Sequence, residues 1–398
     1  MPAFRTIDTL EASGKRVLVR ADLNAPMKDG AVTDTARIDQ AATTIRELAG
    51  KGAKVIVLSH FGRPDGKRVE SLSLKTIVPA LSKAIGRAVA FASDCIGAEA
   101  EAAVGAMKNG DVLLLENTRF HGEEEKNEAR FVAALAKLGD AYVNDAFSAA
   151  HRAHATTEGL AHRLAAYAGR GMQAELEALT RVLEKPEHPV VAIVGGAKVS
   201  SKLAVLENLI AKVDVLVIGG GMANTFLKAQ GLPIGKSLHE PTLLDKAREI
   251  MVAAKARGCV IVLPTDGVVS KEFKAMAEAK TLPVARTPDD GMILDVGSDT
   301  VASIAGRLET AKTVVWNGPL GAFETPPFDL GTNAVARHVA MLTKVGALVS
   351  VAGGGDTLAA LAQAGAEDDF TYCSTAGGAF LEWLEGRELP GVKALEQT

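Results

Sequence analysis

The sequence predicts an α/β protein with two domains, and two observations lead to this fold class. Short runs rich in Val, Ile and Leu alternate with Ala-rich amphipathic segments along the chain, which is the pattern of parallel strands joined by crossover helices. The chain also has 398 residues, 47% of them hydrophobic, which is more than a single core usually serves. We therefore expect two domains, each a mostly parallel sheet covered by helices in a Rossmann-like three-layer sandwich.

The strand candidates are short and nearly continuous apolar runs, as expected for strands buried on both faces. In chain order they are Arg16–Arg20, Lys54–Ser59, Asp111–Leu115, Ala141–Asn144, Pro189–Val194, Asp214–Ile218, Val260–Leu263, Lys312–Trp316 and Ala347–Val351. Between the first two runs, Thr35–Leu48 has a helical period that places Ile38 and Ile45 on one face, and Gly50 ends it. That apolar stripe predicts a helix packed on the core.

The boundary between the domains is predicted near residue 170. Gly169, Arg170 and Gly171 precede a helix-like run over Met172–Lys185, which ends at Pro186. A helix flanked by Gly and Pro can connect two domains and let them move. We expect a first domain over 1–170 and a second over 171–386 that begins with this interdomain helix, the two facing each other across a cleft.

The composition excludes several classes of protein. A net charge of −4 with 23% charged residues disfavours nucleic acid as the main partner. The three cysteines, Cys95, Cys259 and Cys373, are widely spaced and form no Cys-x-x-Cys pair, so neither disulfides nor a zinc site is indicated. The segment from Met1 to Arg5 lacks the apolar part of a signal peptide, and no apolar run approaches the ~18 residues of a membrane span. We expect a cytoplasmic protein without membrane contact.

Polar side chains follow each predicted strand of the first half. Because ligands of open parallel sheets bind outside the carboxyl ends of the strands, these side chains would meet at one edge. Thirteen of the 20 arginines precede residue 171, and a guanidinium fork suits phosphate and carboxylate. The sequence therefore predicts a pocket for a small, multiply anionic ligand. Its candidate residues are Asp22, Asn24, Arg37, His60, Arg63, Arg119, His151 and Arg152.

Each of these residues has a plainer interpretation when it is taken alone. A single arginine is more often a surface charge paired with a neighbouring acid, and it is the shared placement after strands that favours a pocket. His60 could be a metal ligand or a capping residue, but no second His or Cys stands at metal-ligand spacing. His121 and His162 have no such context and are interpreted as structural.

Glycine-rich loops follow the strands of the second half instead. Glycine lets the backbone approach an anion closely, and a following helix aims its N–H groups at that anion. The loops contain neither the Walker A pattern nor the Gly-x-Gly-x-x-Gly dinucleotide pattern. Asp356 offers a hard oxygen that suits Mg²⁺, so we predict a nucleotide-phosphate site. The loops are Gly195–Lys202, Gly219–Met222, Asn317–Glu324, Gly353–Thr357 and Thr375–Ala379.

A nucleotide site in one half and a polyanion site in the other predict phosphoryl transfer between them. The active site would form only when the domains close. Asp22 is the one carboxylate among the arginines that could serve as a base. If the acceptor were itself a carboxylate, it would already be ionised at neutral pH and would need no base.

These motifs resemble the phosphoglycerate kinase family along the whole chain. The resemblance rests on Arg20–Pro26, Ser59–Pro64, Leu115–Phe120 and Ala150–His154, followed in order by the five glycine loops. It implies reversible, Mg²⁺-dependent transfer of a phosphoryl group between ATP and the carboxylate of 3-phosphoglycerate, which gives ADP and 1,3-bisphosphoglycerate. It also implies a monomer, and a C-terminal segment from about residue 387 to 398 that packs back on the first domain.

The resemblance also implies a role for each matching residue. Arg37 and Lys202 would act on the transferring group, and Gly377 and Gly378 would present amides to it. The phosphoglycerate would be held by Asp22, Asn24, Arg37, His60, Arg63, Arg119 and Arg152. The Mg-nucleotide would be held by Lys198, Lys202, Gly220, Gly221, Leu238, Leu294, Asn317, Pro319, Glu324, Gly354, Gly355, Asp356 and Thr357, with Asp356 on the metal.

The chain departs from the family pattern at Ser201, Ala376 and Ile293, where Asp, Gly and Gly are more usual. Each change could alter nucleotide affinity. Two other functions fit parts of the sequence. A polyanion-binding protein without turnover is disfavoured because Lys202 and Arg37 are both present. A nicotinamide-dependent dehydrogenase is disfavoured because its glycine pattern and the acidic residue about 20 positions later are missing.

Overall fold

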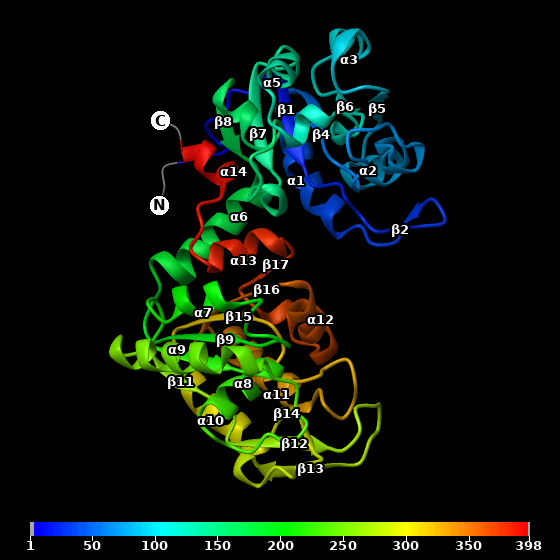
Figure 1. Ribbon diagram of the computed structural model, residues 1–398. Helices are drawn as coiled ribbons and strands as arrows, with labels where there is room; N and C mark the ends of the chain where they lie inside the picture. The colour runs from blue at the N-terminus through cyan, green and yellow to red at the C-terminus, as the bar shows by residue number, and fades with distance from the viewer. Residues whose placement is uncertain (1–3, 397–398) are drawn as a thin grey trace. The chain divides into compact units, whose positions relative to one another are not determined.

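The computed structural model describes residues 4–396, which form two compact units (Figure 1). One unit runs as far as Glu177 and resumes at Glu388, and the other is Ala178–Arg387. The chain therefore passes between the units twice. The first division falls inside helix α6 (Arg170–Leu179), and each unit contains one large parallel sheet. The predicted fold class is confirmed.

The sheet of the first unit has six parallel strands in the order β5-β6-β4-β1-β7-β8. The four central strands lie within one residue of the expected ends. The edge strands β5 and β8 were not predicted, because they are short and β5 is only partly buried. The bounds are β1 Arg16–Ala21, β4 Lys54–Leu58, β5 Val89–Ala92, β6 Val112–Leu115, β7 Ala141–Asp145 and β8 Ala166–Ala168, with a small hairpin of β2 Met27–Lys28 and β3 Ala31–Val32.

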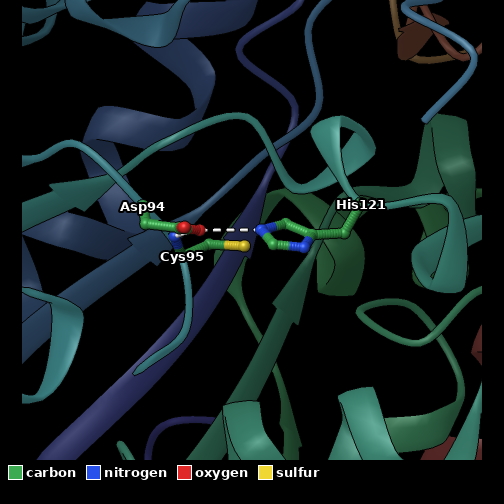
Figure 2. Close-up of side chains that lie close together, drawn as sticks. All are labelled: Asp94, Cys95 and His121. Carbon is green, nitrogen blue, oxygen red and sulfur yellow. Dashed lines mark hydrogen bonds and ion pairs between the residues drawn. The ribbon is translucent and has the colours of Figure 1, made fainter. Parts of the chain in front are cut away.

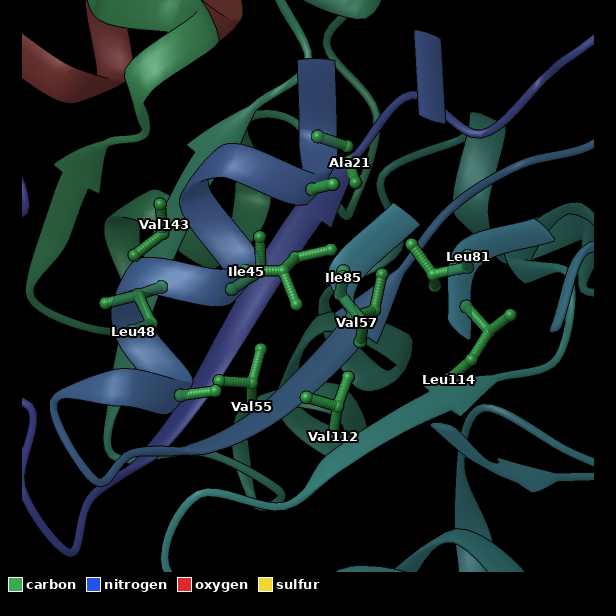
Figure 3. Close-up of a cluster of buried hydrophobic side chains, with 14 of the residues drawn as sticks. Ala21, Ile45, Leu48, Val55, Val57, Leu81, Ile85, Val112, Leu114 and Val143 are labelled. Atoms are coloured by element: carbon green, nitrogen blue, oxygen red, sulfur yellow. The ribbon is translucent and has the colours of Figure 1, made fainter. Parts of the chain in front are cut away.

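The helices of the first unit pack on this sheet and on one another. They are α1 Ala36–Gly50, α2 Val78–Ile85, α3 Gly97–Gly105, α4 Gly122–Glu125, α5 Ala129–Ala136 and α14 Pro390–Lys393, with short turns η3 Thr118–Phe120, η4 Phe147–Ala149, η5 Gly159–His162 and η10 Ala394–Glu396. Ile45 and Leu48 of α1 lie against Val55 and Val57 of β4 in the core shown in Figure 3. Each such buried side chain stabilises the unit by roughly 1.5–3 kcal/mol.

The second unit contains a six-stranded parallel sheet in the order β11-β10-β9-β15-β16-β17. Counted along the chain, this is the 3-2-1-4-5-6 order of a doubly wound sheet. The strands are β9 Val190–Val194, β10 Val215–Ile218, β11 Val260–Val262, β15 Thr313–Asn317, β16 Val349–Gly353 and β17 Tyr372–Ser374. Five of them lie within two residues of the expected ends, and β17, a three-residue edge strand, was not predicted.

A smaller antiparallel sheet extends the second unit. Its order is β13-β12-β14, with bounds β12 Asp266–Ser270, β13 Ala279–Pro283 and β14 Met292–Val296. The helices of this unit are α7 Leu203–Leu209, α8 Gly220–Ala229, α9 Leu244–Ala256, α10 Ser298–Leu308, α11 Leu330–Lys344, α12 Gly355–Ala364 and α13 Gly378–Leu384. No helix in the described part of the chain is long and apolar enough to cross a membrane.

Helix α6 is held firmly at its first turn by residues of the first unit. Asp145 Oδ1, at the end of β7, accepts hydrogen bonds from Gly171 N at 2.8 Å and Met172 N at 3.1 Å. Arg170 pairs with Glu47 and Asp8. These contacts begin the helix two residues before the expected start at Met172, since a carboxylate caps its free N–H groups. After Leu179 the helix continues as a π-helical segment, η6 Thr180–Glu184.

Residues from Glu388 onward belong to the first unit. Gly391 N donates to Ala150 O at 2.8 Å, so α14 lies on the turn that follows β7, and η10 packs near β8. Residues 397 and 398 of the expected C-terminal segment lie outside the described residues.

Candidate active site

A cluster of cationic groups lies at the carboxyl end of the sheet in the first unit. Arg20, at the end of β1, is 1% exposed and donates to Thr156 Oγ1 at 3.0 Å and His60 Nδ1 at 2.8 Å. It also bonds the carbonyl of Ala21. A guanidinium can only donate, so His60 Nδ1 accepts and the imidazole proton sits on Nε2.

The charges of this cluster act on one another. The pKa of His60 lies well below its usual value, first because the ring is buried and then because Arg20, Arg119, Arg152 and His154 face it. Burial and the same arginines lower the pKa of His154 to about 4. Burial also lowers the pKa of Arg119 to about 10. Both imidazoles are therefore neutral at pH 7, and an anion that entered would relieve the repulsion among the guanidinium groups.

Backbone contacts of polar side chains fix the loops that carry these groups. Asn117 is fully buried, and its amide bonds the backbone of Phe61, Leu72 and Arg119 at 2.7–3.2 Å. Arg119 in turn donates to Gly62 O at 2.9 Å. The loops after β4 and β6 are thus tied together, which orients the Arg119 side chain.

Asp22 lies where β1 and β7 are neighbours and the strand order reverses. Its Oδ2 accepts from Arg37 Nη1 at 2.8 Å and from Ser148 Oγ at 2.5 Å, and its Oδ1 accepts from Asn24 N at 3.1 Å. Asn24 Oδ1 accepts from Gly62 N at 3.0 Å. The carboxylate thus organises the basic groups around it.

Two more of the predicted residues have looser surroundings. Arg63 is exposed in the loop after β4, and Arg152 is partly exposed in the turn after β7. Arg152 Nε donates to His151 Nε2 at 3.2 Å. The charge of Arg152 lowers the pKa of both His60 and His154, so Arg152 belongs with the buried cluster. Arg63 lies at the exposed margin of this cluster.

The glycine loops of the second unit enclose a cavity of about 440 Å³ at the carboxyl end of its sheet. Three loops supply its polar walls. The first carries Lys198 and Lys202, the second carries Asn317, and the third carries Asp356 and Thr357. Gly354, Gly355, Gly377 and Gly378 also line it. The predicted phosphate-binding residues are therefore together in one place.

Lys202 is the buried cation of this cavity. Its Nζ donates to Gly195 O at 2.6 Å and to Asn317 O at 2.8 Å. Burial lowers the pKa of Lys202 to about 8, and Asp356 partly opposes the shift. A phosphate entering the cavity would favour the protonated form, so anion binding and protonation of Lys202 are linked.

The loops meet at the reversal of strand order between β9 and β15, where ligands of doubly wound sheets bind. A Cβ on Gly195 would lie 1.8 Å from Pro319 O, so only glycine allows this approach. Thr357 Oγ1 accepts from Gly318 N at 2.7 Å and donates to Gly353 O at 2.8 Å. The backbone amides around the cavity are held in place before any ligand arrives.

A second cavity, of about 660 Å³, continues from the first through Gly196, Ala197, Pro319 and Asp356, which line both. Its walls are more apolar and include Leu238, Leu294 and Phe273, with Gly220 and Gly221 on α8 and Glu324 at the rim. Sequence reasoning missed Phe273, because an aromatic residue that is 60% exposed gives no periodic signal. A flat apolar pocket beside a phosphate cavity fits a nucleotide base.

The three departures from the family pattern lie in or beside these cavities. Ser201 lines the first cavity and bonds Lys198 O at 2.8 Å. Ile293 lines the second, and its backbone N donates to Ser237 Oγ at 2.8 Å. Ala376 is buried just before Gly377. None of them interrupts the lining.

The donors in the first cavity fit a hard cation bound with phosphates. Asp356 is exposed to the cavity at the start of α12. Asn317 Oδ1 is buried and has no hydrogen-bond partner among residues 4–396. Mg²⁺ prefers oxygen ligands and binds through one or two carboxylates plus substrate phosphates, so these two oxygens suit it.

Comparisons with known proteins agree with this arrangement. A profile of the family described as "Phosphoglycerate kinase" matches residues 7–387. The phosphoglycerate kinase of Methylobacterium radiotolerans is 64% identical over 396 residues, 99% of each chain, and that of Allorhizobium ampelinum is 63% identical over the same share. The structure of phosphoglycerate kinase from Coxiella burnetii is 43% identical and matches with a TM-score of 0.93 over 98% of each chain. That from Pyrococcus horikoshii OT3 is 31% identical with a TM-score of 0.81, again over 98% of each chain.

Proposed function

Because the chain belongs to the phosphoglycerate kinase family, it is an enzyme that transfers a phosphoryl group between ATP and 3-phosphoglycerate, and we propose how its residues do so. The observation that carries the proposal is the pair of continuous cavities in the second unit, one lined by glycine loops with Lys202 and Asp356 and the other apolar. A nucleoside triphosphate needs both kinds of wall. Transfer to the carboxylate gives ADP and 1,3-bisphosphoglycerate.

The first unit holds the phosphoglycerate. Arg63, Arg119, Arg152 and neutral His60 bind its phosphate and carboxylate, and Arg37 also contacts the transferring group. Asp22 and Asn24 hold Arg37 and the loop after β4 in place, so the cations keep their positions when the ligand leaves. No general base is assigned, because the acceptor carboxylate is ionised at neutral pH.

The second unit holds the nucleotide. Its base lies between Gly220, Gly221, Leu238 and Leu294, beside Pro319 and Asn317, and Glu324 accepts from the ribose hydroxyls. Lys198, Thr357, Gly354 and Gly355 bind the phosphates. Asp356 holds Mg²⁺, which neutralises phosphate charge when it is bound. Lys202 and the amides of Gly377 and Gly378 stabilise the group in transfer.

Transfer in this scheme requires closure of the two domains. The enzyme works as a monomer in this proposal. Each ligand touches mostly one domain, so a single ligand has little differential affinity for the open and closed forms. Both ligands together favour closure. Small-angle scattering of the free enzyme, both binary complexes and the ternary complex with a non-hydrolysable nucleotide tests this. We expect the radius of gyration to fall clearly only in the ternary complex, and equal radii in all four samples would exclude the hinge.

A coupled assay with ATP, Mg²⁺ and 3-phosphoglycerate tests the reaction itself. Formation of 1,3-bisphosphoglycerate that depends on all three components is expected, and removal of Mg²⁺ by a chelator should abolish it. Binding of both ligands without product would instead indicate a protein that has kept the sites and lost turnover.

A further inference from the structure

Three side chains with metal-binding atoms meet in the first unit, and none of them is a proposed substrate residue. They are Asp94, Cys95 and His121 (Figure 2). Asp94 and Cys95 lie in the loop after β5, and His121 follows η3 after β6. Because β5 and β6 are parallel neighbours, both loops leave the same edge of the sheet. Among the described residues no other group of His, Cys and acidic side chains is assembled in this way.

The spacing of the three atoms is close to that of a tetrahedral zinc site. The carboxylate oxygen, Sγ and imidazole nitrogen all lie within 4.8 Å of one another. Metal–ligand distances of about 2.0–2.3 Å place neighbouring ligands of a tetrahedral Zn²⁺ about 3.3–3.7 Å apart. Binding would need shifts of roughly 1 Å or less: Cys95 Sγ would move toward the other two ligands, and Asp94 Oδ1 and His121 Nε2, now 2.7 Å apart, would separate. Three protein ligands leave a fourth position for water.

Hydrogen bonds already orient the ligands. Asp94 Oδ1 accepts from Cys95 N at 2.7 Å and lies 2.7 Å from His121 Nε2. The His121 ring also packs against Phe131, with 5.2 Å between ring centroids. A cation would take the place of the proton between Asp94 and His121, and the imidazole would keep its proton on Nδ1.

A cation can reach the cluster from solvent, and the acidic side chains around the cluster attract positive charge. The Cys95 side chain is fully buried, while the side chains of Asp94 and His121 are 38% and 25% exposed, so an ion can enter from solvent. Burial, followed by the negative charges of Asp94, Glu124 and Glu116, raises the pKa of the Cys95 thiol. The thiol is therefore protonated in the metal-free protein. Binding must release this proton, and the surrounding carboxylates then attract the cation.

We propose that Asp94, Cys95 and His121 form a binding site for a thiophilic divalent cation, with Zn²⁺ as the preferred ion. Thiolate and imidazole select Zn²⁺ over Mg²⁺, so the site is chemically distinct from the oxygen donors around Asp356. This site could not be predicted from the sequence, because its ligands are not in a Cys-x-x-Cys pattern and only the topology brings His121 to Cys95. Bound metal would cross-link the loops after β5 and β6.

Cobalt titration of the full chain tests the site directly. With metal-free protein, a phosphine reductant and no nucleotide, Co²⁺ should bind with a stoichiometry of one and give a thiolate-to-metal charge-transfer band in the near ultraviolet. Zn²⁺ should displace it, and binding of either ion to the metal-free protein should release protons. Cys95→Ser should abolish the band and weaken Zn²⁺ binding on the order of 100-fold or more, and Asp94→Asn and His121→Gln should weaken it at least about tenfold.

Matched variants elsewhere in the chain serve as controls. Cys259→Ser and Cys373→Ser remove the other free thiols, and His188→Gln removes a similar His–Asp contact, 2.6 Å from Asp214. All three should keep the charge-transfer band. His121→Gln, at a partly exposed position, remains informative if Cys95→Ser fails to fold. Absence of the band in the native protein, its persistence in Cys95→Ser, or an unchanged metal affinity in His121→Gln would overturn the assignment.

Discussion

The two units place their proposed anion sites at the carboxyl ends of similar sheets but build them from different groups. In the first unit the cationic groups are arginine side chains, of which Arg20 and Arg119 are buried, and Asn117 and Asp22 tie the surrounding loops together. In the second unit backbone amides of glycine loops surround the cavity, with Lys202 as its buried cation. Both sites lie where the strand order reverses. The fold thus determines where a ligand binds, and the loop chemistry determines which ligand.

This difference fits the shapes of the two proposed ligands. A guanidinium group can donate two parallel hydrogen bonds to a phosphate or a carboxylate, which suits a small molecule that carries both groups. A polyphosphate chain is longer and is better followed by a row of amides, which only glycine allows to come close. Lysine adds a compact charge on a flexible side chain, and this charge can follow the phosphoryl group during transfer.

The largest effects should come from the one side chain in each unit that we assign to the transferring group. Lys202→Ala and Arg37→Ala should each lower kcat on the order of 10²-fold or more, with a smaller change in KM, because both act on charge in the transition state. Steady-state kinetics on folded variants measures this. Arg46→Ala, on the same helix as Arg37, is the control and should retain its activity. An unchanged kcat in either variant would remove that residue from its role.

Ligand affinities should separate the two sites. His60→Ala and Arg63→Ala should weaken 3-phosphoglycerate binding by about tenfold and leave ATP binding intact, since a hydrogen bond to a charged group contributes roughly 1.5–3 kcal/mol. Asp356→Ala should weaken ATP binding and leave 3-phosphoglycerate binding intact. A higher Mg²⁺ concentration should partly restore the nucleotide affinity of this variant. Calorimetric titration of each ligand with each variant provides the comparison. Equal losses of both affinities in one variant would contradict the assignment of one ligand to each unit.

The buried lysine gives the second site a dependence on pH. The pKa of Lys202 is about 8, below its usual 10.5, so the free enzyme loses this charge as the pH rises through 8. Bound phosphate restores it, so ATP affinity should fall by up to about tenfold per pH unit above pH 8, with proton uptake on binding. Calorimetry in buffers of different ionisation enthalpy measures that uptake. Lys202→Arg stays charged throughout and should lose both effects; if it kept them, another group would be responsible.

The lowered pKa of Lys202 affects folding stability in the direction opposite to its effect on ATP affinity. A buried ammonium disfavours the folded state, and this penalty is fully present below pH 8. Between about pH 8 and the usual value of 10.5 the unfolded chain holds the proton and the folded chain does not, so this residue's contribution to the free energy of unfolding rises with pH.

The smallest effect should come from the segment after Glu388. A Cβ at Gly391 would lie 2.9 Å from the Cα of Ala150, so Gly391→Val should displace the turn that carries Arg152. We expect a few-fold loss of 3-phosphoglycerate affinity with ATP affinity unchanged. Gly50→Ala, where the added methyl has nothing within 4 Å, is the matched control. Normal phosphoglycerate binding by Gly391→Val would show that this contact does not support the site.

The sequence predicted the central strands well because they are buried on both faces and read as continuous apolar runs, as Val112–Leu115 does. It missed the edge strands β5, β8 and β17, which are short, and the antiparallel sheet, where the adjacent polar residues Lys280 and Thr281 lie in a largely exposed strand. It identified His60 and Arg119 from their positions after strands. The role of Arg20 was missed, because a charged residue inside a strand gives no hint that it is buried against Thr156 and His60.

The path of the chain through α14 has a consequence for biosynthesis. The 210 residues of Ala178–Arg387 are translated between the bulk of the first unit and the segment from Glu388 that completes it. Gly391 then bonds Ala150, beside the loop of His151 and Arg152. On the ribosome the second unit can therefore acquire its glycine-lined cavities while the first still lacks its final piece. A chain released early at Arg387 would lack the bond between Gly391 and Ala150, so we expect its second unit to bind nucleotide while the turn that carries Arg152 is left without this support.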